Sequence, residues 1–173
     1  MIYTVTFNPA LDYVMKVEKL QFDDINRTYG EELNYGGKGI NVSVILSRLG
    51  VENTALGFQA GFTGEKLEEL LKADGIKTDF IALKNGMTRI NVKIKAQTEL
   101  DINAVGPPIE EDEVERLFEK IKAFQSGDVI VLAGSVPGTL PPDIYEKILS
   151  VTSKSGVESV VDATGDLLLN VLK

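Results

Sequence analysis

The chain has 173 residues, contains no cysteine and no histidine, and carries a formal net charge of −8. This composition excludes disulfides, thiol catalysis, Cys/His zinc sites and Ser-His-Asp triads. It also leaves no general basic surface for nucleic acid or an anionic membrane, and with no signal-peptide pattern and only short apolar runs we expect a cytoplasmic protein.

The first third of the chain predicts a buried strand, two further strands and a helix. Residues 2–7 are mostly apolar, as in a parallel strand that is covered on both faces. Residues 14–19 alternate loosely between polar and apolar side chains, and residues 28–33 are polar, which indicates an exposed strand. A glycine-rich run follows and leads into a helix that we expect to end at Leu49.

This glycine-rich run predicts an anion site. Gly36, Gly37 and Gly39 leave backbone N–H groups bare at a helix start, where the helix dipole is positive. Lys38 adds a full positive charge at the same place, and phosphate is the anion that we expect there. The alternative is a turn that only allows a helix to pack closely on a strand.

The next segment continues as an alternation of strands and helices. Residues 53–58 and 77–83 are predicted strands, and residues 63–73 form the predicted helix between them, with Thr63 as its N-cap. This order argues for a parallel sheet with right-handed crossovers.

Residues 88–95 break that pattern, because polar and cationic side chains such as Arg89 alternate with apolar ones. A strand of this kind belongs to a sheet that is solvated on one face, and we expect residues 100–105 to pair with it. Together with the earlier polar strands, it predicts a small β-sheet lid inserted at about residues 12–35 and 87–105, covering a cleft.

The last third of the chain returns to the buried α/β pattern. Its predicted elements are an amphipathic helix at 110–124, a buried strand at 128–133, a helix from Pro141 or Pro142 to residue 151, a second buried strand at 157–161 and a helix at 166–172. Ligands of open α/β sheets bind beyond the carboxyl ends of the strands. We therefore expect four loops to converge there, at residues 8–12, 36–41, 134–138 and 162–166.

Polar residues in these loops and on the lid are candidate ligand-binding groups, although each also has a plainer interpretation. Asp12 could be a turn residue, and Asn41 could bond only to its own helix. Arg89 and Lys93 could form a solvated sheet face, Ser135 could bind only water, and Asp162 could cap the last helix. The placement of Arg27, Lys38 and Arg89 near predicted cleft or lid elements of an acidic chain favours a phosphate-bearing ligand.

Four runs of the chain resemble the PfkB carbohydrate kinases of the ribokinase-like superfamily: residues 8–12 (NPALD), 36–43 (GGKGINVS), 88–93 (TRINVK) and 132–137 (LAGSVP). The branch that the chain resembles most is 1-phosphofructokinase, followed by tagatose-6-phosphate kinase. The resemblance implies an α/β fold with a mainly parallel sheet flanked by helices and a small β-sheet lid, which often forms a homodimer interface.

The resemblance also implies an activity, the transfer of the γ-phosphoryl group of ATP to fructose 1-phosphate, which gives fructose 1,6-bisphosphate, with Mg²⁺ as cofactor. One alternative substrate is tagatose 6-phosphate, and another is a nucleoside or an unphosphorylated sugar. A further alternative is a non-catalytic fragment that binds a sugar phosphate or forms dimers.

By resemblance, the substrate-binding residues are Asp12, Gly36, Gly37, Lys38, Asn41, Arg89, Ser135 and Arg27. Asp12 and Asn41 would bind sugar hydroxyls, with the glycine backbone close to the sugar. Lys38, Arg89 and Arg27 would bind the phosphate that the substrate already carries, and Ser135 would assist from its loop. Asp162 would lie near the metal and the ATP phosphates, and no residue of the chain is expected to be a dedicated metal ligand.

The chain departs from the family pattern in one respect. The family's catalytic aspartate lies in a D-T-x-G-A-G-D motif near the C-terminus, and neither this motif nor the N-x-x-E magnesium motif occurs in the chain. We therefore expect residues 1–173 to be an incomplete kinase domain whose catalytic aspartate lies beyond Lys173 and whose C-terminal part is missing. Without that aspartate and its anion hole, the chain alone is expected to be inactive.

Overall fold

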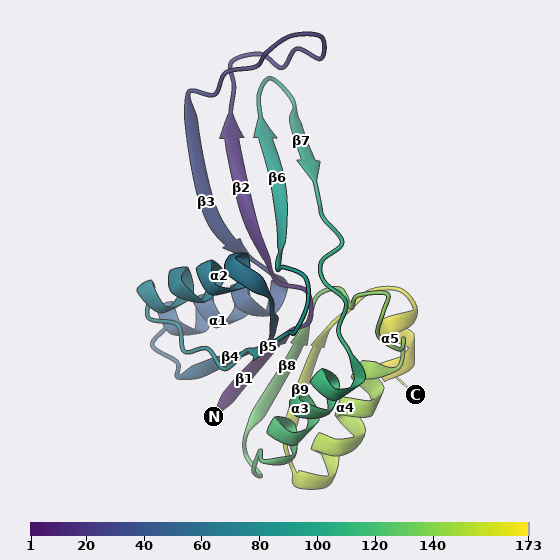
Figure 1. Cartoon of the computed structure of the whole chain (residues 1–173). Helices are drawn as coiled ribbons and strands as arrows, with labels where there is room; N and C mark the ends of the chain where they lie inside the picture. Colours follow the sequence, from purple (N-terminus) through teal and green to yellow (C-terminus); the bar gives the residue numbers. More distant parts are fainter. Residues whose placement is uncertain (173) are drawn as a thin grey trace.

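Two β-sheets organise the chain (Figure 1). The structure, a computed structural model, describes residues 1–172. The main sheet has the strand order β5-β4-β1-β8-β9 and is parallel throughout. Its strands are β1 (Ile2–Thr6), β4 (Asn53–Gln59), β5 (Ile81–Ala82), β8 (Val129–Ala133) and β9 (Glu158–Asp162).

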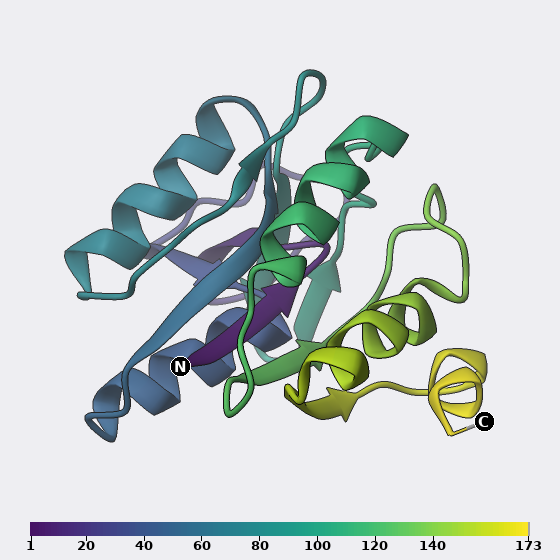
Figure 2. The ribbon, with the colours of Figure 1, turned by 90° about the horizontal axis from the view of Figure 1, so that it is seen from below.

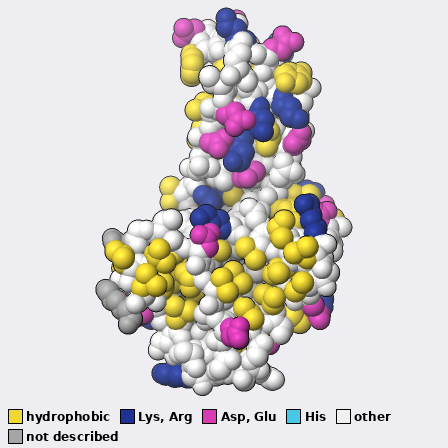
Figure 3. All heavy atoms as spheres, turned by 180° about the vertical axis from the view of Figure 1, so that it is seen from behind, with side chains coloured by type: hydrophobic (Ala, Val, Ile, Leu, Met, Phe, Trp, Pro, Cys, Tyr) yellow, Lys and Arg dark blue, Asp and Glu magenta, His cyan; other side chains and the backbone are white. Residues whose placement is uncertain are grey.

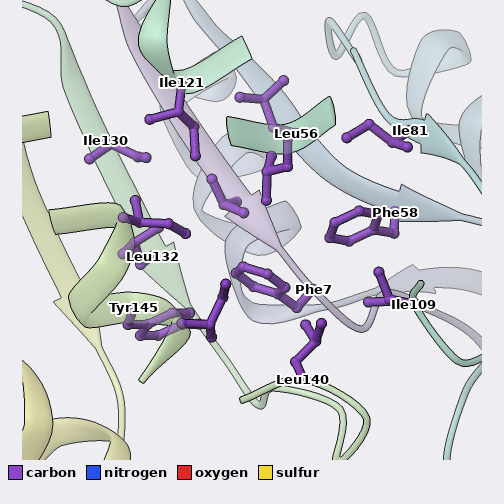
Figure 4. Packing of buried hydrophobic residues seen from close by; sticks show 14 of the residues in the cluster. Phe7, Leu56, Phe58, Ile81, Ile109, Ile121, Ile130, Leu132, Leu140 and Tyr145 are labelled. Carbon is purple, nitrogen blue, oxygen red and sulfur yellow. The ribbon is translucent and has the colours of Figure 1, made fainter. Parts of the chain in front are cut away.

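Helices cover both faces of the main sheet, as expected for the α/β class. They are α1 (Lys38–Arg48), α2 (Gly61–Ala73), α3 (Glu111–Lys122), α4 (Ile144–Thr152) and α5 (Asp166–Val171). Figure 2 shows α1 and α2 on one side of the sheet and α3 and α4 on the other. The larger core lies on the α3 and α4 side, where Phe7, Phe58 and Tyr145 pack together (Figure 4).

The second sheet, here called the small sheet, stands off one end of the main sheet (Figure 1). Its strands are β2 (Ala10–Lys16), β3 (Gly30–Gly36), β6 (Arg89–Lys95) and β7 (Glu99–Ile102), in the order β3-β2-β6-β7. β3 and β7 pair antiparallel with their neighbours, whereas β2 and β6 are parallel. The two chain segments predicted to be solvent-facing therefore meet in one sheet.

The exact extent of these strands differs from the expectation. β2 begins at Ala10, four residues before the predicted start, and β3 runs on to Gly36. Asp12 is consequently a strand residue and not a turn residue. The reason is non-local, because β2 pairs along its whole length with β6, a strand that lies far away in the sequence.

Two helix starts were also predicted wrongly. α2 begins at Gly61, and Thr63 is not its N-cap, because the buried Thr63 hydroxyl instead donates to the carbonyl of Thr88 at 2.8 Å. α4 begins at Ile144, because Pro141 lies in the preceding turn, where its carbonyl accepts a hydrogen bond from the Ile144 N–H group.

The strands predicted at 77–83 and 157–161 differ as well. Only Ile81–Ala82 is a regular strand in the first segment, although Thr78 forms an isolated bridge with Ala55. β9 was expected to be buried, but most of its residues are exposed, because it is the last strand of the sheet in residues 1–172.

Apolar surface remains open in the C-terminal part of the chain, where Val160, Leu169 and Leu172 are exposed. Seen from behind, apolar side chains gather on the body of the molecule below the small sheet, whereas the small sheet carries side chains of both charges (Figure 3). Within the described residues, no helix has the length and apolar character needed to cross a membrane.

Candidate sugar-phosphate site

A cavity of about 690 Å³ lies between the carboxyl end of the main sheet and the root of the small sheet. Its lining includes the predicted residues Gly37, Lys38, Asn41, Arg89, Ser135 and Asp162. All four loops expected to converge therefore contribute to one cavity, the loop at residues 8–12 through Asn8. This is the position that the topology of an open parallel sheet favours for a ligand.

Most of the glycine-rich run belongs to regular secondary structure, so the loop between β3 and α1 is short. Gly36 is the last residue of β3, Gly37 is the N-cap of α1 with φ of 132°, and Lys38 is the first helical residue. A β-carbon on Gly39 would lie 2.8 Å from the carbonyl oxygen of Val5. Only glycine therefore allows α1 to start directly against the end of β1, with its N-terminus facing the cavity.

Asp12 lies beside this turn and is held in place from two sides. Asn91, which is buried, donates a 2.8 Å hydrogen bond from Nδ2 to Asp12 Oδ1. A β-carbon on Gly36 would lie 2.9 Å from Asp12 Oδ2, so the carboxylate occupies the space that any larger residue would need. Lys93 approaches the same carboxylate at 4.0 Å.

Arg89 provides a cation whose hydrogen bonds leave its charge uncompensated. Its guanidinium donates to the backbone carbonyl of Asn8 at 3.0 Å and 3.2 Å and to that of Ala104 at 3.3 Å. No described carboxylate lies within ion-pair distance of Arg89; burial lowers the pKa of Arg89, and the charge of Asp12 acts more weakly in the opposite direction. A guanidinium that is partly desolvated and has no direct ion pair is a strong binder of phosphate oxygens.

Lys38 already forms an ion pair with Asp162. Its ammonium lies 3.2 Å from the carboxylate of Asp162 across the cavity mouth, and both side chains are more than half exposed, at 55% and 61%. Asp162 is the last residue of β9, and the N-cap of α5 is Gly165, so Asp162 does not cap that helix. Ion pairs this exposed are weak and yield readily to a ligand.

Three predicted residues do not line the cavity, namely Asp12, Gly36 and Arg27. Asp12 and Gly36 lie next to the lining residues Lys93 and Gly37, whereas Arg27 belongs to the connection between β2 and β3, which Figure 1 shows at the end of the small sheet far from the main sheet.

Several lining residues were given no individual binding role by the sequence, namely Thr6, Asn8, Lys93, Asn103 and Thr164, although Asn8 and Thr164 lie in loops that were expected to converge. Lys93 shares the face of β6 with Arg89, and the alternation left open whether that face binds a ligand or is only solvated. Asn8 opens the NPALD run, which was a signal for it, whereas Asn103 follows a short polar strand and had none.

Comparison with known proteins assigns the chain to a family. The model that describes pfkB family carbohydrate kinases matches residues 5–173. The chain belongs to the PfkB family of carbohydrate kinases. The resemblance inferred from the four motifs is thereby confirmed.

Relatives and solved structures agree with this assignment. The chain is 44% identical over 169 residues to 1-phosphofructokinase of Bacillus subtilis and 34% identical over 174 residues to tagatose-6-phosphate kinase of Staphylococcus epidermidis. It superposes with a TM-score of 0.92, at 28% identity, on phosphofructokinase-2 from Escherichia coli in complex with fructose-6-phosphate. The expected ribokinase-like fold is confirmed.

The match spans nearly the whole of this PfkB-family chain but only part of each relative. It covers 98% of the chain and 55% of the Bacillus subtilis protein, and 99% of the chain and 57% of the Escherichia coli structure. The chain therefore spans little more than half the length of the proteins it matches, and activities that belong to the whole proteins are considered below as proposals.

The fit of a metal ion and ATP to this half of the fold is partial. Among the side chains that the structure describes, no group of three acidic residues could hold a metal ion. Asp162 is a carboxylate in the cavity lining, and Mg²⁺ bound to a nucleotide needs only one or two carboxylates in addition to phosphates and water. Because Asp162 is paired with Lys38, we derive no step of a reaction through the metal.

Proposed function

We propose that the chain is the sugar-phosphate-binding half of a 1-phosphofructokinase, an enzyme that transfers the γ-phosphoryl group of ATP to fructose 1-phosphate and gives fructose 1,6-bisphosphate. The observation that carries the proposal is Arg89, a partly buried cation bonded to the carbonyls of Asn8 and Ala104 and facing a cavity in a chain of net charge −8. A substrate that already bears a phosphate would supply an anion that pairs directly with Arg89.

Residues in and beside the cavity fit the sugar part of such a substrate. Asn41 lines the cavity from the first turn of α1 and offers both a donor and an acceptor. Asp12 lies beside the lining residue Lys93, and its carboxylate would accept hydrogen bonds from sugar hydroxyls. Gly36 and Gly37 allow the ring to approach the backbone. Lys38 joins Arg89 on the phosphate, and Ser135 adds a hydroxyl from the turn after β8.

The remaining partners follow from the same proposal. Mg-ATP would approach from the side of Asp162. Arg27 would reach a sugar phosphate only if the far end of the small sheet lay against the substrate site of a second copy of the chain. We expect a metabolic enzyme of the cytoplasm, with a small-molecule phosphosugar as its substrate and no nucleic acid or membrane as a partner.

The small sheet is also the proposed lid and homodimer interface, formed by the inserts at about residues 12–35 and 87–105. Its register aligns four apolar side chains in one row across the face opposite Arg89: Leu33, Tyr13, Val92 and Ile102. Leu33 and Ile102 are 38% and 55% exposed. Pairing with a second copy would bury this apolar row. Ile102→Glu should therefore shift the mass measured by analytical ultracentrifugation from that of a dimer to that of a monomer.

Tagatose 6-phosphate is the second candidate substrate, because one of the relatives is a tagatose-6-phosphate kinase. Isothermal titration of the 173-residue chain with fructose 1-phosphate, tagatose 6-phosphate and fructose decides between them. We expect the tightest binding for fructose 1-phosphate and no measurable binding of fructose. Equal binding of fructose and its phosphate would contradict the proposal.

A coupled assay for ADP completes the test. We expect no turnover of fructose 1-phosphate by this chain, because it lacks the family's D-T-x-G-A-G-D run. Turnover would show that the chain has a catalytic group of its own. A chain that binds phosphosugar without turnover would also be consistent with a binding or dimerisation module, which intact-mass analysis of the natural protein distinguishes by its length.

A further inference from the structure

Tyr145 is a buried residue whose hydroxyl has a partner at the candidate site. The side chain lies in the first turn of α4 and is 0% exposed, and its ring packs against Phe7 with centroids 5.7 Å apart (Figure 4). Phenylalanine would fill this part of the core equally well. The hydroxyl, however, donates a hydrogen bond to the backbone carbonyl of Gly134 at 3.2 Å, which is long for an O–H···O bond.

Gly134 is the residue at which β8 turns into the cavity. Its φ of 105° lies in the region that favours glycine, and its N–H group donates to the carbonyl of Asp162 at 3.2 Å. Both backbone polar groups of Gly134 are therefore hydrogen-bonded, its carbonyl by the Tyr145 hydroxyl and its N–H group by the Asp162 carbonyl. A turn with such an uncommon backbone conformation persists only where its surroundings determine it.

Two predicted phosphate-site residues depend on the position of this turn. Ser135 follows Gly134 directly and lines the cavity. The α-carbon of Gly134 also packs against Lys38, because a β-carbon at Gly134 would lie 3.4 Å from Lys38 Cβ. A shift of the turn would therefore move the Ser135 hydroxyl and release the stem of Lys38.

The phenol is well suited to act as a permanent donor. Burial, and secondarily the carboxylate of Asp162, raise the pKa of Tyr145. The hydroxyl therefore stays protonated throughout the neutral range, and a backbone carbonyl can only accept.

We propose that Tyr145 is a positioning residue, whose hydroxyl holds the Gly134–Ser135 turn so that Ser135 and Lys38 face the phosphate of a sugar-phosphate ligand. The inference rests on the proposed function for the identity of the ligand. The contact between Tyr145 and the turn is independent of it, and the experiment separates the two.

The test replaces Tyr145 with phenylalanine in the 173-residue chain, which keeps the ring and removes only the hydroxyl. We expect faster amide hydrogen exchange, measured by NMR on the unliganded protein, at Gly134, whose N–H group donates to Asp162. We also expect fructose 1-phosphate to bind about threefold to tenfold more weakly, because the hydrogen bond is single and neutral. Unchanged exchange at the turn would overturn the proposal.

A matched control lies at the other end of the same helix. Thr152 is 1% exposed, and its hydroxyl lies 3.2 Å from that of Ser159, far along α4 from the cavity. Thr152→Val removes a buried hydroxyl at a comparable cost in stability. We expect it to leave both the exchange of Gly134 and the affinity for fructose 1-phosphate unchanged. Equal effects of the two variants would show that Tyr145 acts only through stability.

A double-mutant cycle with Ser135→Ala identifies the route of the effect. If Tyr145 acts by placing Ser135 and Lys38, the loss caused by Tyr145→Phe should shrink when Ser135 is already alanine, and fully additive losses would contradict this route. If the unsubstituted chain does not bind fructose 1-phosphate, the proposed function fails, while the exchange measurement still decides whether the hydroxyl holds the turn.

Discussion

Asn91 Nδ2 donates a 2.8 Å hydrogen bond to Asp12 Oδ1 where β6 and β2 run side by side in parallel register. The second carboxylate oxygen, Oδ2, lies beside Gly36 and near Lys93, which lines the cavity. Asn91→Ala should let the carboxylate turn toward Lys93, which now lies 4.0 Å away. We expect the affinity for fructose 1-phosphate, measured by isothermal titration, to fall about threefold to tenfold.

The control for this variant is Asn26→Ala. Asn26 makes three side-chain hydrogen bonds within the β2–β3 connection, two with Gln21 and one with Asp24, but it lies outside the cavity lining. Its removal should leave the affinity unchanged. If Asn91→Ala and Asn26→Ala bound fructose 1-phosphate with equal affinity, the binding role of Asp12 would not depend on its hydrogen bond from Asn91.

Arg89→Ala should weaken fructose 1-phosphate binding by about tenfold or more, since hydrogen bonds to charged groups contribute about 1.5–3 kcal/mol. The affinity of Arg89→Lys should lie between those of the wild type and Arg89→Ala, because a lysine keeps the charge but not the planar guanidinium. Arg116→Ala, on the exposed face of α3, is the matched loss of one positive charge. Equal losses for Arg89→Ala and Arg116→Ala in the titration would remove Arg89 from the site.

Gly39→Ala should destabilise the chain even though alanine is the better helix former. The added β-carbon would lie 2.5 Å from Thr6 Oγ1 and 2.8 Å from the backbone oxygen of Val5. Overpacking of this kind costs about 1–3 kcal/mol, measurable as a lower midpoint in urea. Gly138→Ala is the control, because a β-carbon added there would have no atom within 4 Å, and it should be neutral.

Asp128 should make stability depend on pH in the acid range. A hydrogen bond from the Gln125 N–H group, and then the amino terminus of Met1, lower its pKa from the usual 3.8. A lowered folded-state pKa gives stability that is present above 3.8 and is lost as pH falls through the folded value. The difference in urea midpoint between the wild type and Asp128→Asn should be present near neutral pH and shrink in acid, and a constant difference would contradict this origin.

Local patterns predicted the elements whose stabilising contacts are local. The acidic first turn of α3 is an example, because Glu110 and Glu113 close a capping box that needs only four consecutive residues. The alternation from Arg89 to Lys95 likewise identified β6 and its solvated face. The four PfkB-like runs identified the family from residues that the structure brings to one cavity.

Features that depend on contacts between distant segments could not be predicted from the sequence. Asp12 looked like a turn residue because its partner Asn91 lies 79 residues away. β9 looked buried because the predicted strand contains Val157, Val160 and Val161, but burial depends on neighbours and not on composition. Lys93 looked like surface, because no pattern in the sequence shows which face of a small sheet looks onto a cavity.

The parallel pairing of β2 with β6 also has a consequence for how the protein acquires its binding ability. Pairing segments this far apart requires closing a long loop, and such contacts form slowly and late in folding. The site is complete only when β2 and β6 are paired, since Asp12 and Arg89 belong to different inserts. We therefore expect a phosphosugar to slow unfolding, by holding these two strands together, and to leave the early steps of refolding unchanged.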